Sequence, residues 1–219
     1  MLRYLFFLLF PLVGFLALSS NGMLSGSLIV LAFVLIPLFE LILPTTPRIL
    51  SKEKVAALQE SEMYSYLLYL LVPSQFILLA YFLIEVRDAS FSYVLILKIV
   101  TMGILCGTMA INIAHELGHR QRKFDQFLAK ALLMTSLYMH FFIEHNRGHH
   151  KNVATPNDPA TARKNESIYV FVVRCIVSAY RSAWRLENER LARNNKSKFN
   201  FDNAMIQYGL VQLLFLVGI

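Results

Sequence analysis

The sequence predicts an all-α membrane protein, a polytopic helical bundle with histidine boxes at its cytoplasmic side. No charged residue occurs from Tyr4 to Phe39 or from Met63 to Ile84, and 56% of the 219 residues are hydrophobic. Because about 20 apolar residues in a helix cross the hydrocarbon core of a bilayer, each of these stretches is long enough to span it. This composition argues against a water-soluble globular domain.

The membrane helices are predicted to come in two pairs. Residues 2–43 form a transmembrane hairpin, which breaks at the turn-forming residues 19–22. The second pair covers residues 63–114, and a polar connector at 44–62 separates it from the hairpin. The chain therefore enters and leaves the bilayer several times before its first histidine.

The basic side chains set the predicted orientation. The formal net charge is +7, and residues 144–198 carry 11 basic and 5 acidic side chains. Beside apolar spans, this bias follows the positive-inside rule and favours contact with membrane lipid rather than with nucleic acid. It predicts a multi-pass membrane protein, with the end of the second pair at His115 on the cytoplasmic side.

The rest of the chain is predicted to continue the same single domain, 1–219, in three parts. A histidine-box region covers residues 115–166, an amphipathic helix covers 167–194, and a further span begins at 203–219. The two cysteines, Cys106 and Cys175, stand far apart in the sequence, so no thiolate metal site or disulfide framework is predicted.

Residues 126–143 are apolar except for Lys130 and resemble another span. A full crossing would carry His145 about 30 Å from His119, since a helix rises about 1.5 Å per residue. Two histidine clusters that far apart cannot bind a shared metal site. We therefore predict that this segment does not cross the membrane completely.

The amphipathic helix carries a basic stripe made of Arg174, Arg181 and Arg185, which lie on one side of a helix at 100° per residue. Two interpretations remain open. The arginines reach lipid phosphates at the membrane surface, or they dock an acidic redox protein whose charge complements theirs.

All six histidines lie between His115 and His150, and five of them form two clusters. His115 and His119 stand four residues apart, so both imidazoles project from one face of a helix. His145 and His149 repeat this spacing, while the adjacent His149 and His150 point in different directions. Five imidazoles without a thiolate fit two neighbouring iron ions that activate dioxygen.

Four further residues are expected to support the ligands without being ligands themselves. Glu116 is predicted to accept a hydrogen bond from an imidazole or to act as a base. Glu144 and Asp158 are carboxylates near the second cluster, and His140 is interpreted as a hydrogen-bonded core residue beside it.

Three strings resemble the bacterial membrane alkane monooxygenases, a branch of the membrane fatty acid desaturase and hydroxylase superfamily. They are HELGHR at 115–120, EHNRGHHKNVATPNDPATAR at 144–163 and SAWRLENERL at 182–191. The resemblance implies a non-haem diiron enzyme of the bacterial inner membrane. It would insert one oxygen atom of dioxygen into the terminal methyl of a medium- or long-chain alkane, with electrons from rubredoxin. The implied iron ligands are His115, His119, His145, His149 and His150.

The chain departs from this family after its second box. Family members continue to a histidine in a tyrosine-glycine motif and to a third histidine box, whereas this chain has no histidine after His150. We therefore expect a truncated chain that is inactive alone. Three alternatives stay open: a desaturase or other lipid hydroxylase, an intramembrane zinc protease built on the HExxH string, and a non-enzymatic membrane remnant.

Overall fold

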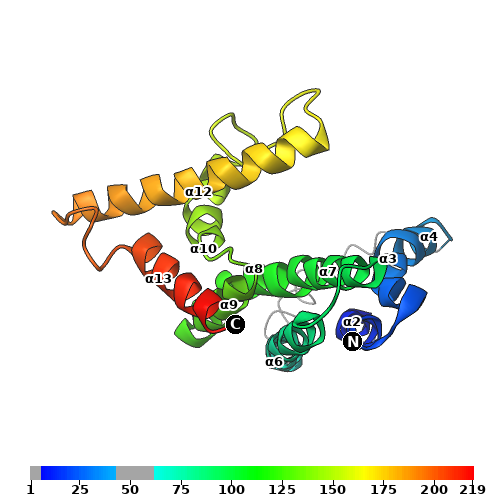
Figure 1. Ribbon diagram of the computed structural model, residues 1–219. Coiled ribbons are helices and arrows are strands. Elements are labelled where there is room, and N and C mark those ends of the chain that lie inside the picture. The colour runs from blue at the N-terminus through cyan, green and yellow to red at the C-terminus, as the bar shows by residue number, and fades with distance from the viewer. Residues whose placement is uncertain (1–5, 43–61) are drawn as a thin grey trace. The chain divides into compact units, whose positions relative to one another are not determined.

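The computed structural model describes residues 6–42 and 62–219. All regular elements in these ranges are helical, which confirms the predicted all-α class. The chain divides into two compact units, Met1–Ile113 and Ala114–Ile219, and each is described by itself (Figure 1). Most of the predicted connector, at 44–61, lies outside the described residues, as do residues 2–5 of the predicted hairpin.

The first unit consists of short and long helical segments in succession. They are η1 (Phe6–Leu8), α2 (Leu9–Ser19), η2 (Gly22–Gly26), α3 (Ser27–Val30), η3 (Leu31–Leu35), α4 (Ile36–Ile42), α6 (Glu62–Val86), α7 (Tyr93–Leu105) and η4 (Cys106–Ile111). The break after α2 falls at the predicted turn. There Gly22 has a φ of +73°, a left-handed conformation that glycine adopts without a steric penalty.

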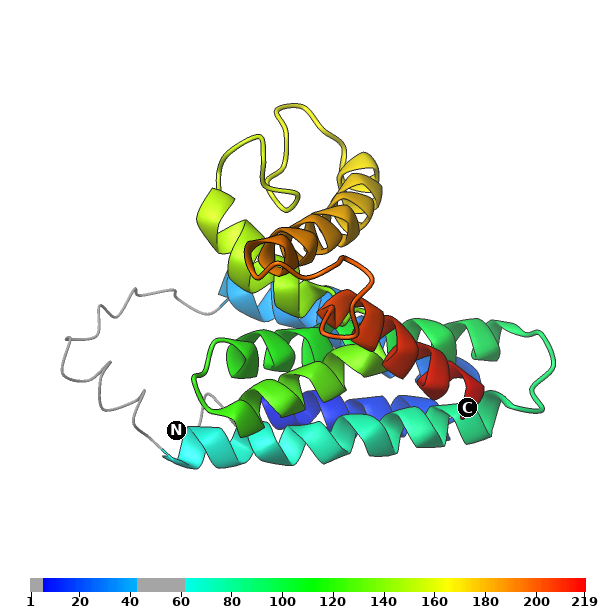
Figure 2. The same ribbon diagram turned by 90° about the vertical axis from the view of Figure 1, so that its left-hand side faces the viewer.

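Helix α2 packs against both α6 and α7, and Figure 2 shows α2 lying alongside α6. Its side chain Leu18 is fully buried, as are Leu28 on α3 and Leu105 at the end of α7. A Cβ atom on Gly14 would lie 2.8 Å from a methyl carbon of Leu105, so this glycine permits the close approach of α2 and α7.

Two buried polar side chains of this unit, Lys98 and Thr101, have partners on neighbouring helical segments. Lys98, the only lysine on α7, forms an ion pair of 2.7 Å with Glu85 near the end of α6. The Thr101 hydroxyl donates a hydrogen bond of 3.1 Å to the backbone oxygen of Ser25. These two contacts offset the cost of burying a charged and a hydroxyl group in the apolar interior.

Three helices in the described residues are long and apolar enough to cross a membrane: Gly22–Ile42, Tyr64–Val86 and Tyr93–Gly118. Two further apolar helices, Phe6–Ser19 and Ala204–Val217, are shorter than the roughly 20 residues that a perpendicular crossing requires. The structure therefore agrees with a protein that passes the membrane several times.

The helix α8 (Asn112–Gly118) continues from η4 and leads the chain into the second unit. The remaining elements of that unit are α9 (Lys123–Thr135), α10 (Phe141–Glu144), η5 (His145–His149), α11 (His150–Asn152), α12 (Ile168–Arg193) and α13 (Ala204–Val217). Helix α9 ends at Thr135, and a turn separates it from α10. The segment 126–143 is therefore not one continuous helix, and its position relative to the membrane stays a prediction.

Helix α12 organises the second unit. The Ser167 hydroxyl caps its first turn by accepting a hydrogen bond from the Val170 backbone N–H. Both α10 and α13 pack against it, and Ile143, Ala183 and Met205 form a small buried core where these three helices meet. This packing fixes α10, and with it the histidine-bearing turn that follows.

Candidate metal centre

Four histidines of the second unit converge on one point. His115 lies on α8 and His119 directly follows that helix, while His145 begins η5 and His150 begins α11. One ring nitrogen from each of the four lies within 4.8 Å of those of the others. The two sequence clusters, which are 26 residues apart, therefore form a single group of imidazoles.

The Nε2 atoms of His119, His145 and His150 form a triangle. Its edges measure 3.1 Å from His119 to His145, 3.0 Å from His145 to His150 and 3.3 Å from His150 to His119. The Nε2 atom of His115 lies 3.2 Å from that of His119. An ion held by imidazole nitrogens at about 2.1 Å places adjacent nitrogens about 3.0 Å apart in an octahedron and about 3.4 Å apart in a tetrahedron. The observed edges match these values.

The donor set itself favours a cation at this point. A neutral imidazole nitrogen carries either a proton or a lone pair, so three nitrogens that face one another cannot all hydrogen-bond among themselves. A metal ion accepts a lone pair from each of them. The geometry therefore fits an imidazole-bound metal ion.

A π-helical turn selects the members of this group. His145–His149 form η5, in which the chain winds more widely than in an α-helix. His145 consequently shares a face with His150, five residues later. The sequence pattern predicts that His145 and His149 share a face, as they would in an α-helix, and this expectation does not hold in the wider turn. His149 is rotated out of the four-histidine group, although its ring still stacks on that of His145, with centroids 5.2 Å apart.

His149 is held by a buried carboxylate. Its Nδ1 atom lies 3.0 and 3.1 Å from the two carboxylate oxygens of Asp158, which is only 2% exposed. Thr161 and the Ala160 backbone N–H also donate hydrogen bonds to Asp158. Burial would raise the pKa of Asp158, but these hydrogen bonds outweigh burial and lower its pKa. An ionised Asp158 fixes the proton of His149 on Nδ1 and leaves the Nε2 lone pair free.

The surroundings of His145 and His119 favour the neutral form of these two imidazoles. Burial, followed by the charges of the neighbouring histidines, lowers the pKa of His145 to about 3. The same two causes lower the pKa of His119, although the carboxylate of Glu116 opposes the shift. Glu116 is half-buried on α8 and acts on His119 through its charge. A neutral ring is the form that offers a lone pair to a metal.

Glu144 and His140 lie beside the histidine group and outside it. Both are buried, and within the described chain Glu144 Oε1 and His140 Nε2 have no hydrogen-bond partner. The His140 ring lies between those of Tyr138 and Tyr180, with centroids 4.5 and 5.2 Å away. Burial lowers the pKa of His140 to about 4, whereas burial and then the charge of Asp158 raise the pKa of Glu144.

The absence of a side chain at Gly148 leaves space for the buried carboxyl of Glu144. A Cβ atom at position 148 would overlap Glu144 Oε1 and would lie 3.0 Å from its Cδ and 3.1 Å from a methyl carbon of Leu186. A side chain at this position would therefore require the Glu144 carboxyl or the turn itself to move. The glycine thus lets η5 pack closely on Glu144 and on α12.

The three arginines of the predicted stripe have different surroundings. Arg174 binds Glu166 at 2.6 Å and donates hydrogen bonds to the backbone oxygens of Pro159 and Thr161, so it holds the loop that carries Asp158. Arg181 and Arg185 are exposed, and Arg185 lies 3.9 Å from Glu189. Only these two arginines are free to meet a lipid or a protein partner.

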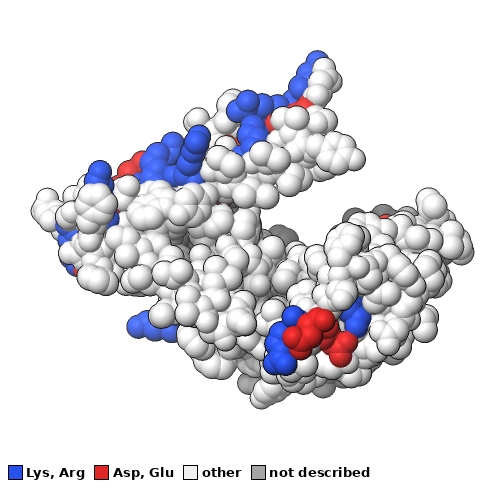
Figure 3. Space-filling model, in the orientation of Figure 1, with Lys and Arg blue, Asp and Glu red and all other residues white. Residues whose placement is uncertain are grey.

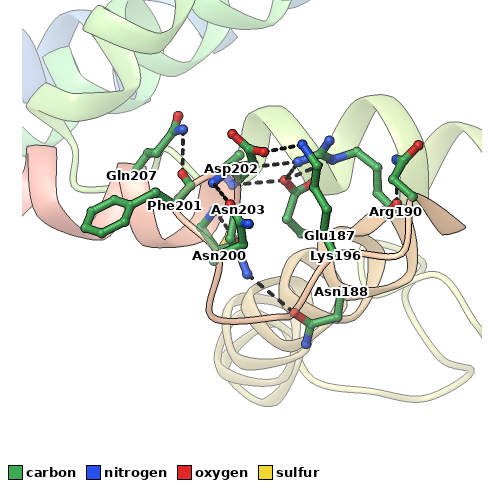
Figure 4. A network of polar contacts seen from close by, with 12 residues as sticks. Glu187, Asn188, Arg190, Lys196, Asn200, Phe201, Asp202, Asn203 and Gln207 are labelled. Atoms are coloured by element: carbon green, nitrogen blue, oxygen red, sulfur yellow. Dashed lines mark hydrogen bonds and ion pairs between the residues drawn. The ribbon is translucent and has the colours of Figure 1, made fainter. Parts of the chain in front are cut away.

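The sequence reasoning missed a second polar network next to the histidines. Glu187 on α12 accepts hydrogen bonds of 2.7 Å from both Arg147 and Arg190 and one of 2.9 Å from the Ala204 backbone N–H. Figure 4 shows Glu187 and Arg190 directed toward the loop that leads into α13. Burial would raise the pKa of Glu187, but the hydrogen bonds lower it to about 2. The string SAWRLENERL contains Glu187 and Arg190, three residues apart on the predicted helix. This spacing of opposite charges is the signal that could have indicated the network.

This network lines a cavity of 390 Å³ whose wall also includes His119. The lining residues are mostly polar or basic, among them Arg120, Gln126 and Asn146. The Asn146 amide donates a hydrogen bond of 2.9 Å to the backbone oxygen of Phe142, so it supports α10 rather than a histidine.

Comparison with known proteins identifies the family of this chain. The model of the fatty acid desaturase family matches residues 89–219, which include both histidine clusters. The chain belongs to the fatty acid desaturase family.

Several similar proteins are alkane 1-monooxygenases. The chain is 38% identical to alkane 1-monooxygenase 1 of Alcanivorax borkumensis and to alkane 1-monooxygenase of Pseudomonas putida, in each case over 90% of its length. It is 42% identical to alkane 1-monooxygenase of Ectopseudomonas oleovorans over 74% of its length. The matched regions cover 49%, 50% and 41% of these proteins, so the chain spans about half the length of the relatives.

Proposed function

We propose that this chain forms part of a membrane oxidoreductase that inserts one oxygen atom of dioxygen into the terminal methyl of a medium- or long-chain alkane. The observation that carries the proposal is the convergence of His115, His119, His145 and His150 in a chain similar to alkane 1-monooxygenases. A methyl C–H bond is strong and unpolarised, so acid–base groups alone cannot activate it. Bound iron would supply the oxidising chemistry that the reaction requires.

We further propose two non-haem iron ions, with His115, His119, His145, His149 and His150 among their ligands. The four-histidine group fits one ion. His149 supports a second, because it lies beside the group and its bond to Asp158 leaves Nε2 unprotonated. The chain's own residues would orient these ligands: Asp158 binds Nδ1 of His149, and the widened turn η5 brings His145 and His150 to the same side.

The same proposal includes a location and an electron donor. The positive-inside rule puts the histidines on the cytoplasmic side of the bacterial inner membrane. A rubredoxin-type protein would deliver electrons there, and the exposed Arg181 and Arg185 suit an acidic partner.

A desaturase or another lipid hydroxylase is the main alternative, because the family match alone includes it. An intramembrane zinc protease is less favoured. A HExxH zinc site uses His115 and His119, and it does not require His145 and His150 in the same group.

The test is to produce the full chain in membranes of a bacterium that does not oxidise alkanes, together with rubredoxin and its reductase. Cells receive octane and dioxygen labelled with the heavy isotope of oxygen, and membranes are assayed for 1-octanol and for bound metal. We expect bound iron, lost in a His145→Ala, His150→Ala variant but not in a His140→Asn control. Labelled 1-octanol would show in addition that the chain is active alone, against the expectation drawn from its missing histidines. Zinc without iron would favour the protease, and new double bonds in fatty acyl chains would favour the desaturase.

A further inference from the structure

The first half of α12 presents an apolar surface that no described part of the chain covers. Six residues form this surface, which we call the outer stripe: Tyr169, Val172, Val173, Ile176, Val177 and Tyr180. They fall within an arc of about 140° at about 100° per residue. Tyr169 is 82% exposed and Val173 is 65% exposed, so the stripe is a continuous apolar face and not a scatter of single residues.

The opposite face of the same half-helix is anchored. Arg174 points to the loop that carries Asp158, where it binds Glu166 and two backbone oxygens. Phe171 and Ser178, on the same side, are half-buried. The helix therefore cannot rotate to hide the outer stripe without breaking the hydrogen bonds of Arg174.

In the second half of α12, the face that continues the outer stripe is buried against other helices. Ala183, Glu187 and Leu191 continue the arc of the outer stripe, and all three are fully buried. There α10 and α13 pack against the helix. The outer stripe thus extends an established contact surface beyond the point at which these two helices end.

The composition around the stripe indicates what covers it. Of the three arginines between Ser167 and Leu186, Arg174 is paired with Glu166, while Arg181 and Arg185 are exposed. The exposed Arg163 and Lys164 precede this segment. Figure 3 shows Lys and Arg side chains gathered along the surface formed by α12 and the loop before it. Tyrosines stand at both ends of the stripe, and Trp184, the only tryptophan, lies one turn beyond on the same arc.

Cations and aromatic rings around an apolar face are typical of helices that lie in a membrane interface. The apolar half-helix from Ile168 to Tyr180 is about 20 Å long, too short to cross a hydrocarbon core of about 30 Å. A bilayer is also the surrounding medium of a chain with three helices that can span it. We propose that the outer stripe of α12 lies in the interfacial layer of a leaflet with anionic headgroups, with the helix parallel to the membrane surface.

This inference is independent of the proposed reaction and can be tested without metal or substrate. The full chain is reconstituted into lipid nanodiscs in a Trp184→Phe background, which removes its only tryptophan. A single reporter is then introduced as Val173→Trp on the outer stripe, or as Ala192→Trp at an exposed position on the polar side of the same helix. Both variants are checked for the helical content and the elution volume of the parent protein.

Fluorescence is measured with lipids brominated on the acyl chain and, separately, with iodide in the buffer. For the reporter at 173 we expect brominated lipid to reduce emission about twofold or more and iodide to have little effect, with the reverse for the reporter at 192. We also expect the quenching by brominated lipid to weaken when phosphatidylglycerol is replaced by phosphatidylcholine.

Two results would overturn the proposal. If iodide quenches the reporter at 173 as strongly as the one at 192, the stripe faces water. If neither quencher reaches the reporter at 173, protein covers the stripe, and cross-linking between copies would then show whether a second chain does so.

Discussion

Replacing Gly148 by alanine should displace the turn that carries His145 and His150. The added methyl would overlap Glu144 Oε1 and would lie 3.1 Å from a methyl carbon of Leu186. Neither neighbour can retreat easily, because Glu144 is buried and Leu186 packs against the core between α10 and α12. The turn itself must therefore shift, and the imidazole triangle opens with it.

Two opposing effects determine how much Gly148→Ala changes the free energy of unfolding. Overpacking a filled interior costs about 1–3 kcal/mol, while alanine in place of glycine inside a helix contributes about 1 kcal/mol of stability. We therefore expect the free energy of unfolding to fall by up to about 2 kcal/mol. Misplacing one imidazole should also weaken binding of Co²⁺ about tenfold, which corresponds to about 1.4 kcal/mol.

The assay is Co²⁺ titration of purified protein, followed by thermal unfolding. Gly118→Ala is the matched control, because a Cβ atom there would make only ordinary contacts of 3.5 Å or more with Phe142 and Ala129. The double variant Glu144→Ala, Gly148→Ala should recover Co²⁺ affinity by removing the obstacle. Unchanged Co²⁺ affinity and stability in Gly148→Ala, or equal damage in Gly118→Ala, would refute this account of the turn.

Three other changes have definite expected outcomes. His150→Ala should reduce Co²⁺ affinity more than His149→Ala, since His150 belongs to the four-histidine group and His149 lies beside it; equal losses in the titration would contradict this. Asp158→Asn should weaken metal binding about 10-fold to 100-fold through the orientation of His149, and equilibrium dialysis would show it. Glu187→Gln should cost about 3 kcal/mol of stability at neutral pH, because the pKa of Glu187 falls from 4.5 to about 2 on folding. That contribution is fully present above pH 4.5 and disappears as the pH falls through about 2, so acid unfolding curves of parent and variant should converge at low pH.

Several helices of this fold were predictable from the hydrophobic and polar patterns of the sequence. The amphipathic helix predicted at 167–194 is observed at Ile168–Arg193, since the hydroxyl of Ser167 caps one end and polar residues close the other. The convergence of His119 with His145 was expected from the chemistry of the histidines, and the apolar pattern of 126–143 alone would have suggested a crossing that separates them.

The membership of the histidine group was not predictable from spacing. It depends on a wide turn at η5, and that turn depends on how Gly148 packs against Glu144 and Leu186, residues whose proximity only the tertiary structure reveals. The binding of Arg174 to the loop at 158–166 was not predictable for the same reason. Its helical position matches that of Arg181, and only the path of the loop at 158–166 distinguishes the two.

The five-residue step from His145 to His150 has a consequence for engineering. A designer who copied these four imidazoles onto a regular α-helical scaffold would recover His115 and His119 but lose one donor of the other pair, because an even winding presents position 149 instead of position 150. Transplanting the centre would mean carrying the widened turn with it, together with the small residue and the carboxyl that allow the backbone to bulge there.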